Sequence, residues 1–289
     1  MYFNYIENNN IIYSIDKIRL KTYISYSLFT ELQFRFDTCW KDSLKYFYTS
    51  CQTRQYYYNY VVKTDDKNSF WFGFLHNTEK RDIYTDKYSL TIEFNPNKIK
   101  DNFILLYLLN LSGNWYVRGY DLACDLKINI LDIIFDRGLK RSYKIFSNGF
   151  DDKTIYIGKN NGRIKIYNKK RESNLDIVGD LTRVEISNQL DNFDISTIKT
   201  FKYPDNFPLL YLNNYLYTFK DYDDKTLLAV LYAVQNNFPV NNLSRVYRKK
   251  VKGLLEGGCS IKFDNKSATM CFNKTIFHYF MNNDKVRWK

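Results

Sequence analysis

The chain has 289 residues, 45% of them apolar, with a formal net charge of +12 and an isoelectric point near 9.2. This length allows one large core or two small ones, and the basic charge favours an anionic partner, nucleic acid first. The five cysteines form no CxxC pair, which argues against a disulfide framework or a zinc ribbon and favours a reducing cytoplasm. No secretory leader is expected, and the longest apolar run, residues 103–109, is too short to span a membrane.

Residues 1–112 are predicted to form a first α+β unit. It opens with a strand at 11–24, and Phe29, Leu32 and Phe36 follow at helical spacing. Alternating patterns predict three more strands, at 56–62, 70–75 and 89–94. Asn95-Pro96 is expected to end the sheet and to begin a helix through Ile99, Phe103, Leu106 and Leu109.

Residues 113–195 repeat this pattern as a second unit. A strand at 115–128 precedes a short helix with Leu131, Ile134 and Phe135 that ends at Gly138, and strands follow at 154–158, 163–168 and 181–187. The closing strands match, Leu-Thr-Ile-Glu-Phe against Thr-Arg-Val-Glu-Ile. The predicted fold is therefore a duplicated α+β fold of βαβββ-like units, with a mostly antiparallel sheet, helices on one face and the other face open.

Residues 196–289 are predicted to be helical and basic. Leu227, Leu228, Leu231 and Val234 form an apolar stripe behind Asp224, a candidate N-cap. A second helix beginning near Asn242 carries cations before Gly253: Arg245, Arg248, Lys249, Lys250 and Lys252. The two helices and the turn between them are either a DNA-reading unit, or helices packed on the core whose cations lie on a solvated face. Both interpretations stay open. The tail from Gly258 shows alternating stretches without a recognisable motif.

The stretch 154–168 predicts a β-hairpin with a determined register. Pairing Ile155 with Ile166 and Ile157 with Ile164 buries all four isoleucines and leaves Asn160-Asn161 as a two-residue turn. The open face then carries Thr154 opposite Tyr167 and Tyr156 opposite Lys165, with Lys169 just beyond. A downstream strand presents Arg183 and Glu185 to the same kind of surface.

The strand 118–127 carries candidate metal ligands. Tyr120, Leu122, Cys124 and Leu126 point one way, while Asp121, Ala123 and Asp125 point the other, as an open acidic notch. With Glu185, and with Glu93 from the first unit, these carboxylates predict an all-oxygen site for Mg²⁺ or Mn²⁺. Zinc is not expected, because there are only two histidines, without ligand spacing. Phosphate-binding glycine loops and a GxSxG motif are absent, which argues against nucleotide hydrolysis and serine esterase chemistry.

These residue types fit phosphodiester chemistry. A tyrosine phenol can attack phosphorus and keep the broken strand attached as a phosphotyrosine ester. Because a free phenol has a pKa near 10, nearby cations or a metal must favour the phenolate. Lys165, Lys169 and Arg183 are the candidate phosphate clamp, and a divalent ion on the carboxylates would neutralise charge on the phosphoryl oxygens.

Four motifs in one order resemble the Rep_trans replication initiation factors. They are Tyr120-Asp-Leu-Ala-Cys-Asp125, Thr154-Ile-Tyr-Ile-Gly158, Arg163-Ile-Lys-Ile-Tyr-Asn-Lys-Lys-Arg-Glu172 and Thr182-Arg-Val-Glu185. The resemblance covers about residues 11–195 of the chain. That family includes initiators of rolling-circle plasmids, relaxases of conjugative elements and filamentous-phage replication proteins. Arg118 lies three residues before Asp121 rather than the family's two, and the usual serine-rich turn is absent.

The resemblance implies a metal-dependent nicking and strand-joining enzyme that starts rolling-circle replication. Tyr167 would be the nucleophile, with Tyr156 as the second choice, and Asp121, Asp125 and Glu185 would hold the metal. Candidate DNA contacts are Arg163, Arg245, Arg248, Lys249 and Lys250. The implied partner is origin DNA, single-stranded or hairpin, with a host helicase and a second copy of the chain as further candidates and no membrane. The alternatives are a conjugative relaxase with the same chemistry, a non-catalytic DNA-binding regulator, and an RNA-binding module.

Overall fold

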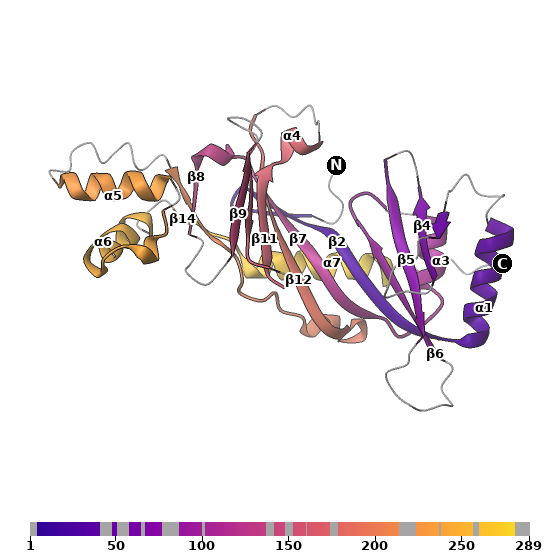
Figure 1. Ribbon diagram of the computed structural model, residues 1–289. Coiled ribbons are helices and arrows are strands. Elements are labelled where there is room, and N and C mark those ends of the chain that lie inside the picture. The colour runs from indigo at the N-terminus through magenta and orange to yellow at the C-terminus, as the bar shows by residue number, and fades with distance from the viewer. Residues whose placement is uncertain are drawn as a thin grey trace.

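A computed structural model gives the fold of most of the chain. It describes residues 5–40, 48–50, 58–64, 67–76, 87–99, 102–136, 142–147, 153–159, 161–173, 179–213, 224–236, 238–256 and 260–280. The protein is an α+β molecule built around a large antiparallel sheet, with helices packed on it and two further helices at one end (Figure 1).

The large sheet has the strand order β3-β4-β5-β6-β2-β7-β12-β11-β10-β9, and β1 pairs with β2. Its strands are β1 (Ile6–Asn8), β2 (Ile11–Ser25), β3 (Tyr48–Ser50), β4 (Tyr58–Lys63), β5 (Ser69–His76), β6 (Lys87–Phe94), β7 (Tyr116–Leu126), β9 (Tyr143–Ser147), β10 (Lys153–Ile157), β11 (Arg163–Asn168) and β12 (Thr182–Asp194). In each half the last long strand returns to pair with the first, β6 with β2 and β12 with β7. The two halves join where β2 pairs with β7. The boundaries at 112 and 195 stay predictions: the sheet is continuous from one half to the other, and β12 ends at Asp194.

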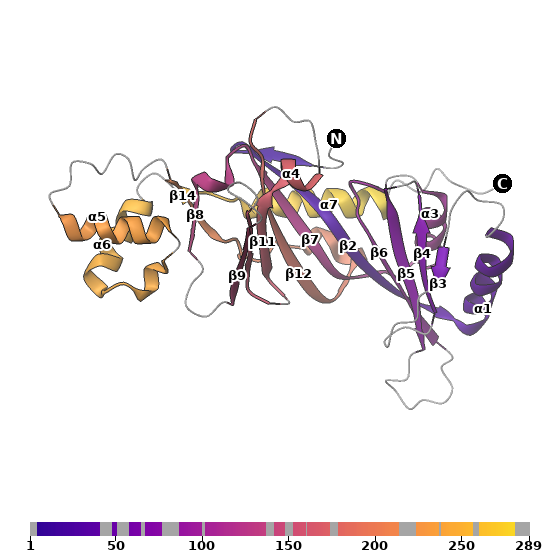
Figure 2. The same cartoon turned by 45° about the horizontal axis from the view of Figure 1, so that its top comes forward.

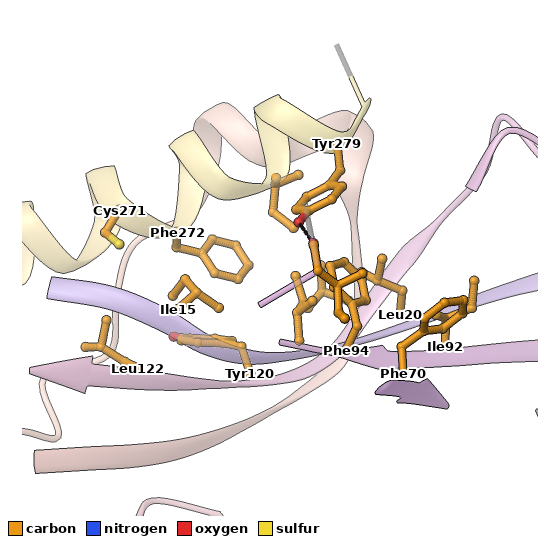
Figure 3. Packing of buried hydrophobic residues seen from close by; sticks show 14 of the residues in the cluster. Ile15, Leu20, Phe70, Ile92, Phe94, Tyr120, Leu122, Cys271, Phe272 and Tyr279 are labelled. Atoms are coloured by element: carbon orange, nitrogen blue, oxygen red, sulfur yellow. Dashed lines mark hydrogen bonds between the residues drawn. The ribbon is translucent and has the colours of Figure 1, made fainter. Parts of the chain in front are cut away.

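The core lies between the sheet and α7 (Asn265–Phe280) (Figure 3). Phe272 contacts Tyr120 of β7 with ring centroids 4.6 Å apart, and Tyr279 contacts Phe94 of β6 at 4.9 Å. The Tyr279 hydroxyl also donates a hydrogen bond of 2.5 Å to the Ile99 carbonyl. The tail, in which the sequence showed no recognisable motif, thus holds a core helix, whose buried residues recur at helical spacing: Ala268, Cys271, Phe272, Ile276 and Tyr279.

The first half carries the helix that its sequence pattern predicts. α1 (Tyr26–Phe34) begins at Ser25, whose hydroxyl accepts a hydrogen bond from the Leu28 amide, and it continues as a π-helical turn (Arg35–Cys39). Phe29 of α1 stacks on Tyr88 at 4.1 Å between ring centroids. The predicted helix start at Asn95-Pro96 is wrong, because α3 (Phe103–Leu109) begins only after Asn102, whose side chain caps it.

The second half lacks its predicted helix. Residues Ile130–Asp132 form one 3-10 turn, and Ile133–Asp136 continue as strand β8. β8 pairs with β13 (Leu209–Leu212), which pairs with β14 (Ser260–Ile261) in a second small sheet. Ile134 and Phe135 are buried through strand pairing rather than helix packing, and Gly138 lies outside the described residues.

A small helical module lies at the end of the molecule beyond the small sheet (Figure 2). α5 (Lys225–Gln235) begins at Asp224, whose carboxylate accepts a hydrogen bond of 3.0 Å from the Leu227 amide, so the predicted N-cap is confirmed. α6 (Arg245–Glu256) follows a 3-10 turn (Val240–Asn242) and includes Gly253. The two helices enclose a separate core that includes Leu227, Leu231, Val234, Val251 and Leu255. Within the described part of the chain, no helix has the length and apolar character needed to cross a bilayer.

Candidate active site on the open face of the sheet

The hairpin of β10 and β11 has the predicted register. Thr154 pairs with Tyr167, Ile155 with Ile166, Tyr156 with Lys165 and Ile157 with Ile164. All four isoleucines are at most 1% exposed, as expected for side chains on the core face. β10 ends at Ile157 and β11 begins at Arg163, and between them Gly158 and Gly162 adopt positive φ of 80° and 71°. The two-residue turn at Asn160-Asn161 stays a prediction. Asn160 lies outside the described residues.

Tyr167 lies on the sheet face opposite α7, which we call the open face. Its neighbours across β12 and β7 are Arg183 and then Asp125, in one row of the sheet. The Tyr167 hydroxyl donates a short hydrogen bond to the Glu185 carboxylate. Only 2% of Tyr167 is exposed, so the phenol is buried rather than presented to solvent as its strand position predicted.

Two ammonium groups lie over the Tyr167 ring. Lys165 Nζ is 3.9 Å from the ring centroid and Lys169 Nζ is 5.6 Å away, both within cation–π range. Lys169 opens the short helix α4 (Lys169–Ser173), which follows β11 directly. Glu172 of α4 holds both ammonium groups, at 3.3 Å from Lys165 and 2.7 Å from Lys169. Glu172 thus occupies the position in which a phosphate oxygen would meet these two cations.

The pKa shifts in this cluster indicate a protonated phenol beside a basic carboxylate. Burial, together with the neighbouring Glu185 charge, raises the pKa of Tyr167 well above its usual value. Burial also raises the pKa of Glu185, against the lowering effect of the hydrogen bond from Tyr167. For Glu172, burial is outweighed by Lys169 and Lys165, and its pKa falls. The Tyr167 phenol is therefore held protonated, and the Glu185 carboxylate is the acceptor of its hydrogen bond.

Arg183 forms a buried ion pair beside Tyr167. Its guanidinium binds both oxygens of Asp125, at 2.6 and 2.7 Å, and reaches Asp16 at 3.3 Å. The side chains of Arg183 and Asp125 are 3% and 0% exposed. The prediction of an open notch around Asp125 is therefore wrong, because Arg183 lies directly opposite it on β12 and closes it. In this arrangement Arg183 binds carboxylates of the protein rather than a phosphate.

Glu185 lies near this pair, but the predicted metal ligands Glu93 and Asp121 lie apart from it. Glu93 binds Lys17 at 3.1 Å and Arg19 at 2.8 Å, and Asp121 lines the same pocket as Glu93. Among the residues that the structure describes, no group of three or more His, Cys, Asp or Glu side chains is placed to hold a metal ion. This arrangement does not supply the convergent carboxylate ligands that a divalent ion needs. Binding of Mg²⁺ or Mn²⁺ stays a prediction from the sequence.

Tyr156 has a more accessible position than Tyr167. It is partly exposed and lines a shallow hollow of about 490 Å³ with Lys144, Phe146 and Thr154. Phe146 packs against the Tyr156 ring edge-on, with centroids 5.7 Å apart. Tyr156 pairs with Lys165 across the hairpin, so both tyrosines border the same lysine.

The predicted DNA contacts fall in two separate places. Arg163 is exposed on the open face at the start of β11. Arg245, Lys249 and Lys250 are exposed on α6, although Lys250 pairs with Asp224 at 3.2 Å. Arg248 is partly buried and donates a hydrogen bond to the Leu243 carbonyl, so it acts in part as a structural residue of the module.

Two residues at the site escaped the sequence analysis. Asp16 lies where the pairing of β2 with β7 shifts register between Ile15 and Lys17, and Arg183 and the Asn95 amide both contact it. Strand alternation could not place Asp16, because a register shift changes which residues face each way. Glu172 lies in the same sequence motif as Tyr167. Its spacing of three residues from Lys169 in a helix is the pattern that could have predicted their ion pair.

Comparisons with known proteins do not identify a family. No protein-family model matches the chain, and no curated protein matches it. A solved structure of a rolling circle replication initiator protein from Geobacillus stearothermophilus matches 85% of this chain and 97% of its own, at 11% identity and a TM-score of 0.38. A likeness of this strength establishes neither family nor activity, so the function has to be argued from the residues.

Proposed function

We propose that the protein is a replication initiator that nicks and rejoins single-stranded DNA through Tyr167. The observation that carries this proposal is the hydrogen bond from the Tyr167 phenol to Glu185 beneath two lysine ammonium groups. A nucleophile, a base and a phosphate-binding pair lie together, which is the arrangement that phosphoryl transfer needs. The order of the four sequence motifs supports the same reaction.

The proposed step transfers a DNA strand to the tyrosine. Glu185 takes the phenolic proton, and the Tyr167 oxygen forms a bond to phosphorus as the bond to the 3′ oxygen breaks. The 3′ oxygen leaves, takes a proton from solvent and becomes a free 3′ hydroxyl that can prime synthesis. Lys165 and Lys169 neutralise charge on the phosphoryl oxygens once Glu172 has released them. Attack by a 3′ hydroxyl on the phosphotyrosine ester reverses the step and rejoins the strand.

Glu172→Gln is expected to increase adduct formation about two- to fivefold, since each partly exposed ion pair is worth up to about 1 kcal/mol. The neutral amide would hold the two ammonium groups less firmly, so a phosphate would displace it more easily. The measurement is formation of the protein–DNA adduct on gels, together with nitration of Tyr167 as a report of its exposure. Glu31→Gln, which breaks an ion pair with Arg35 elsewhere, is the matched control. A decrease in adduct for Glu172→Gln would show that Glu172 supports the reaction instead of covering the site.

The exposed cations of α6 are proposed to contact the DNA backbone. Replacing Arg245 and Lys249 together by Glu should weaken DNA binding and reduce the slope of log affinity against log salt by about two. Fluorescence anisotropy over a salt series measures both quantities. The control is Lys199→Glu, an exposed charge reversal on the 3-10 helix Ile195–Thr200. An unchanged salt slope would favour the alternative in which α6 is only a solvated face.

One observation favours a second candidate function, a DNA-binding regulator without nicking activity. Tyr167 is 2% exposed and Arg183 is committed to Asp125, so neither reaches a ligand in this arrangement. The two functions are separated by incubation with supercoiled origin DNA and Mg²⁺ or Mn²⁺. A covalent adduct supports the nicking enzyme, and binding without an adduct supports the regulator. The same reaction with a chelator tests the metal requirement.

A further inference from the structure

The open face holds a charged pocket away from Tyr167 that the nicking step does not use. Its volume is about 260 Å³, and it is lined by residues of β2, β6, β7, β11 and β12. Lys17, Asp121, Ser187 and Arg163 form one row across four adjacent strands, because Asp121 pairs with both Lys17 and Ser187, and Ser187 with Arg163. The pocket is smaller than those that hold drug-sized ligands and suits a single base.

The two carboxylates of the pocket have different partners. Glu93 is neutralised by Arg19 at 2.8 Å and Lys17 at 3.1 Å, and its pKa falls because these cations outweigh its burial. Asp121 forms no ion pair with any residue that the structure describes. The Ser187 hydroxyl donates one hydrogen bond to the Asp121 carboxylate, which has about four acceptor positions. Asp121 is therefore a hydrogen-bond acceptor with unused capacity.

Arg163 supplies the donors on the other side of the pocket. It is exposed and has no ion-pair partner within the described ranges. A guanidinium can donate two parallel hydrogen bonds to the O6 and N7 atoms of guanine, whereas a carboxylate can accept from the N1 and N2 groups of its Watson–Crick edge. Adenine, cytosine and thymine each lack that pair of adjacent donors. Guanine is the base whose edges match both Asp121 and Arg163.

The position of the pocket suits a strand that also passes Tyr167. Arg163 and Tyr167 are four residues apart on β11 and point to the same face, which separates them by about 13 Å. Lys17 and Arg19 are half exposed at the pocket and can meet phosphates of the same strand. We propose that this pocket binds a guanine base of single-stranded DNA a few nucleotides from the scissile phosphate, with Asp121 and Arg163 reading its edges. This inference rests on the proposed function, because it takes DNA to lie on the open face.

Binding of short oligonucleotides tests the inference without catalysis. The probes are fluorescent oligothymidine 12-mers with one central guanine, inosine, 7-deazaguanine or adenine, measured by anisotropy in EDTA. The wild type should bind the guanine probe about fivefold tighter or more than the adenine probe, since a bidentate contact discriminates by at least that factor. Inosine lacks the N2 amino group and 7-deazaguanine lacks N7, so each should lose part of the preference.

Asp121→Asn should remove the guanine preference while leaving the affinity for the adenine probe within about twofold. The matched control is Asp191→Asn, an exposed aspartate on β12, which should keep the preference. Equal binding of guanine and adenine probes by the wild type would overturn the guanine pocket and leave the nicking proposal standing. Failure to bind any probe would overturn both. Circular dichroism of the variants establishes that they are folded.

Discussion

Tyr167→Phe is expected to abolish the covalent protein–DNA adduct, with a loss of at least roughly a thousandfold in rate. The change removes the attacking oxygen and one hydrogen bond to Glu185, and nothing else. Because only that bond is lost, the free energy of unfolding should fall by about 1 kcal/mol. Adduct formation on a labelled origin strand and urea denaturation measure the two effects separately.

Tyr156→Phe is the matched control for Tyr167→Phe, since both tyrosines border Lys165 on the same face. It should retain the adduct, because among the described residues no carboxylate is hydrogen-bonded to the partly exposed Tyr156 as Glu185 is to Tyr167. Loss of the adduct in Tyr156→Phe, with retention in Tyr167→Phe, would make Tyr156 the nucleophile. Retention in both variants would remove the tyrosine mechanism.

Arg183→Met is expected to destabilise the fold by about 3–5 kcal/mol. It removes the buried counter-ion of Asp125, whose side chain is 0% exposed, and it also removes a partner of Asp16. Equilibrium unfolding in urea measures the loss, and the midpoint should fall while the slope stays the same.

The double variant Arg183→Met with Asp125→Leu distinguishes the stability contributed by the ion pair from the cost of burying one charge without its counter-ion. Replacing both charges by apolar groups of similar size should recover most of the stability lost in the single variant. Arg118→Met, at an exposed arginine that hydrogen-bonds Asn192, should change stability by no more than about 0.5 kcal/mol. A loss below about 1 kcal/mol for Arg183→Met would show that the ion pair with Asp125 does not stabilise the fold.

Local pattern predicted the parts of the fold that depend on one strand and its neighbour. The range of β11 and the register of its hairpin are confirmed, because a slip by one residue would bury lysines and expose isoleucines. The helix of the second half was wrong for a related reason. An apolar pair such as Ile134 and Phe135 fits a buried strand as well as a helix, and only the pairing of β8 with β13 decides between them.

The site was predicted as a set of residue types but not as a set of contacts. Strand alternation placed Tyr167, Arg183, Glu185 and Asp125 on one face, and the structure has them there. Their order along each strand did not show that Arg183 would bind Asp125, 58 residues away, or that Glu172 would hold the lysines over Tyr167. The metal prediction rested on counting carboxylates, which leaves out the cations that neutralise them.

By itself, the sequence determined which side chains share a face of the sheet, because alternation and burial of isoleucine depend only on neighbours along the strand. It also determined the helix capped by Asp224 and the basic helix that follows it, since capping and helical spacing are local. Tertiary structure alone decided that Tyr167 is buried, that Arg183 is an internal counter-ion and that Asp121 has unused hydrogen-bonding capacity. Burial and charge pairing depend on which strands are neighbours in the sheet. The neighbours are determined by the packing of the whole sheet and of α7 against it.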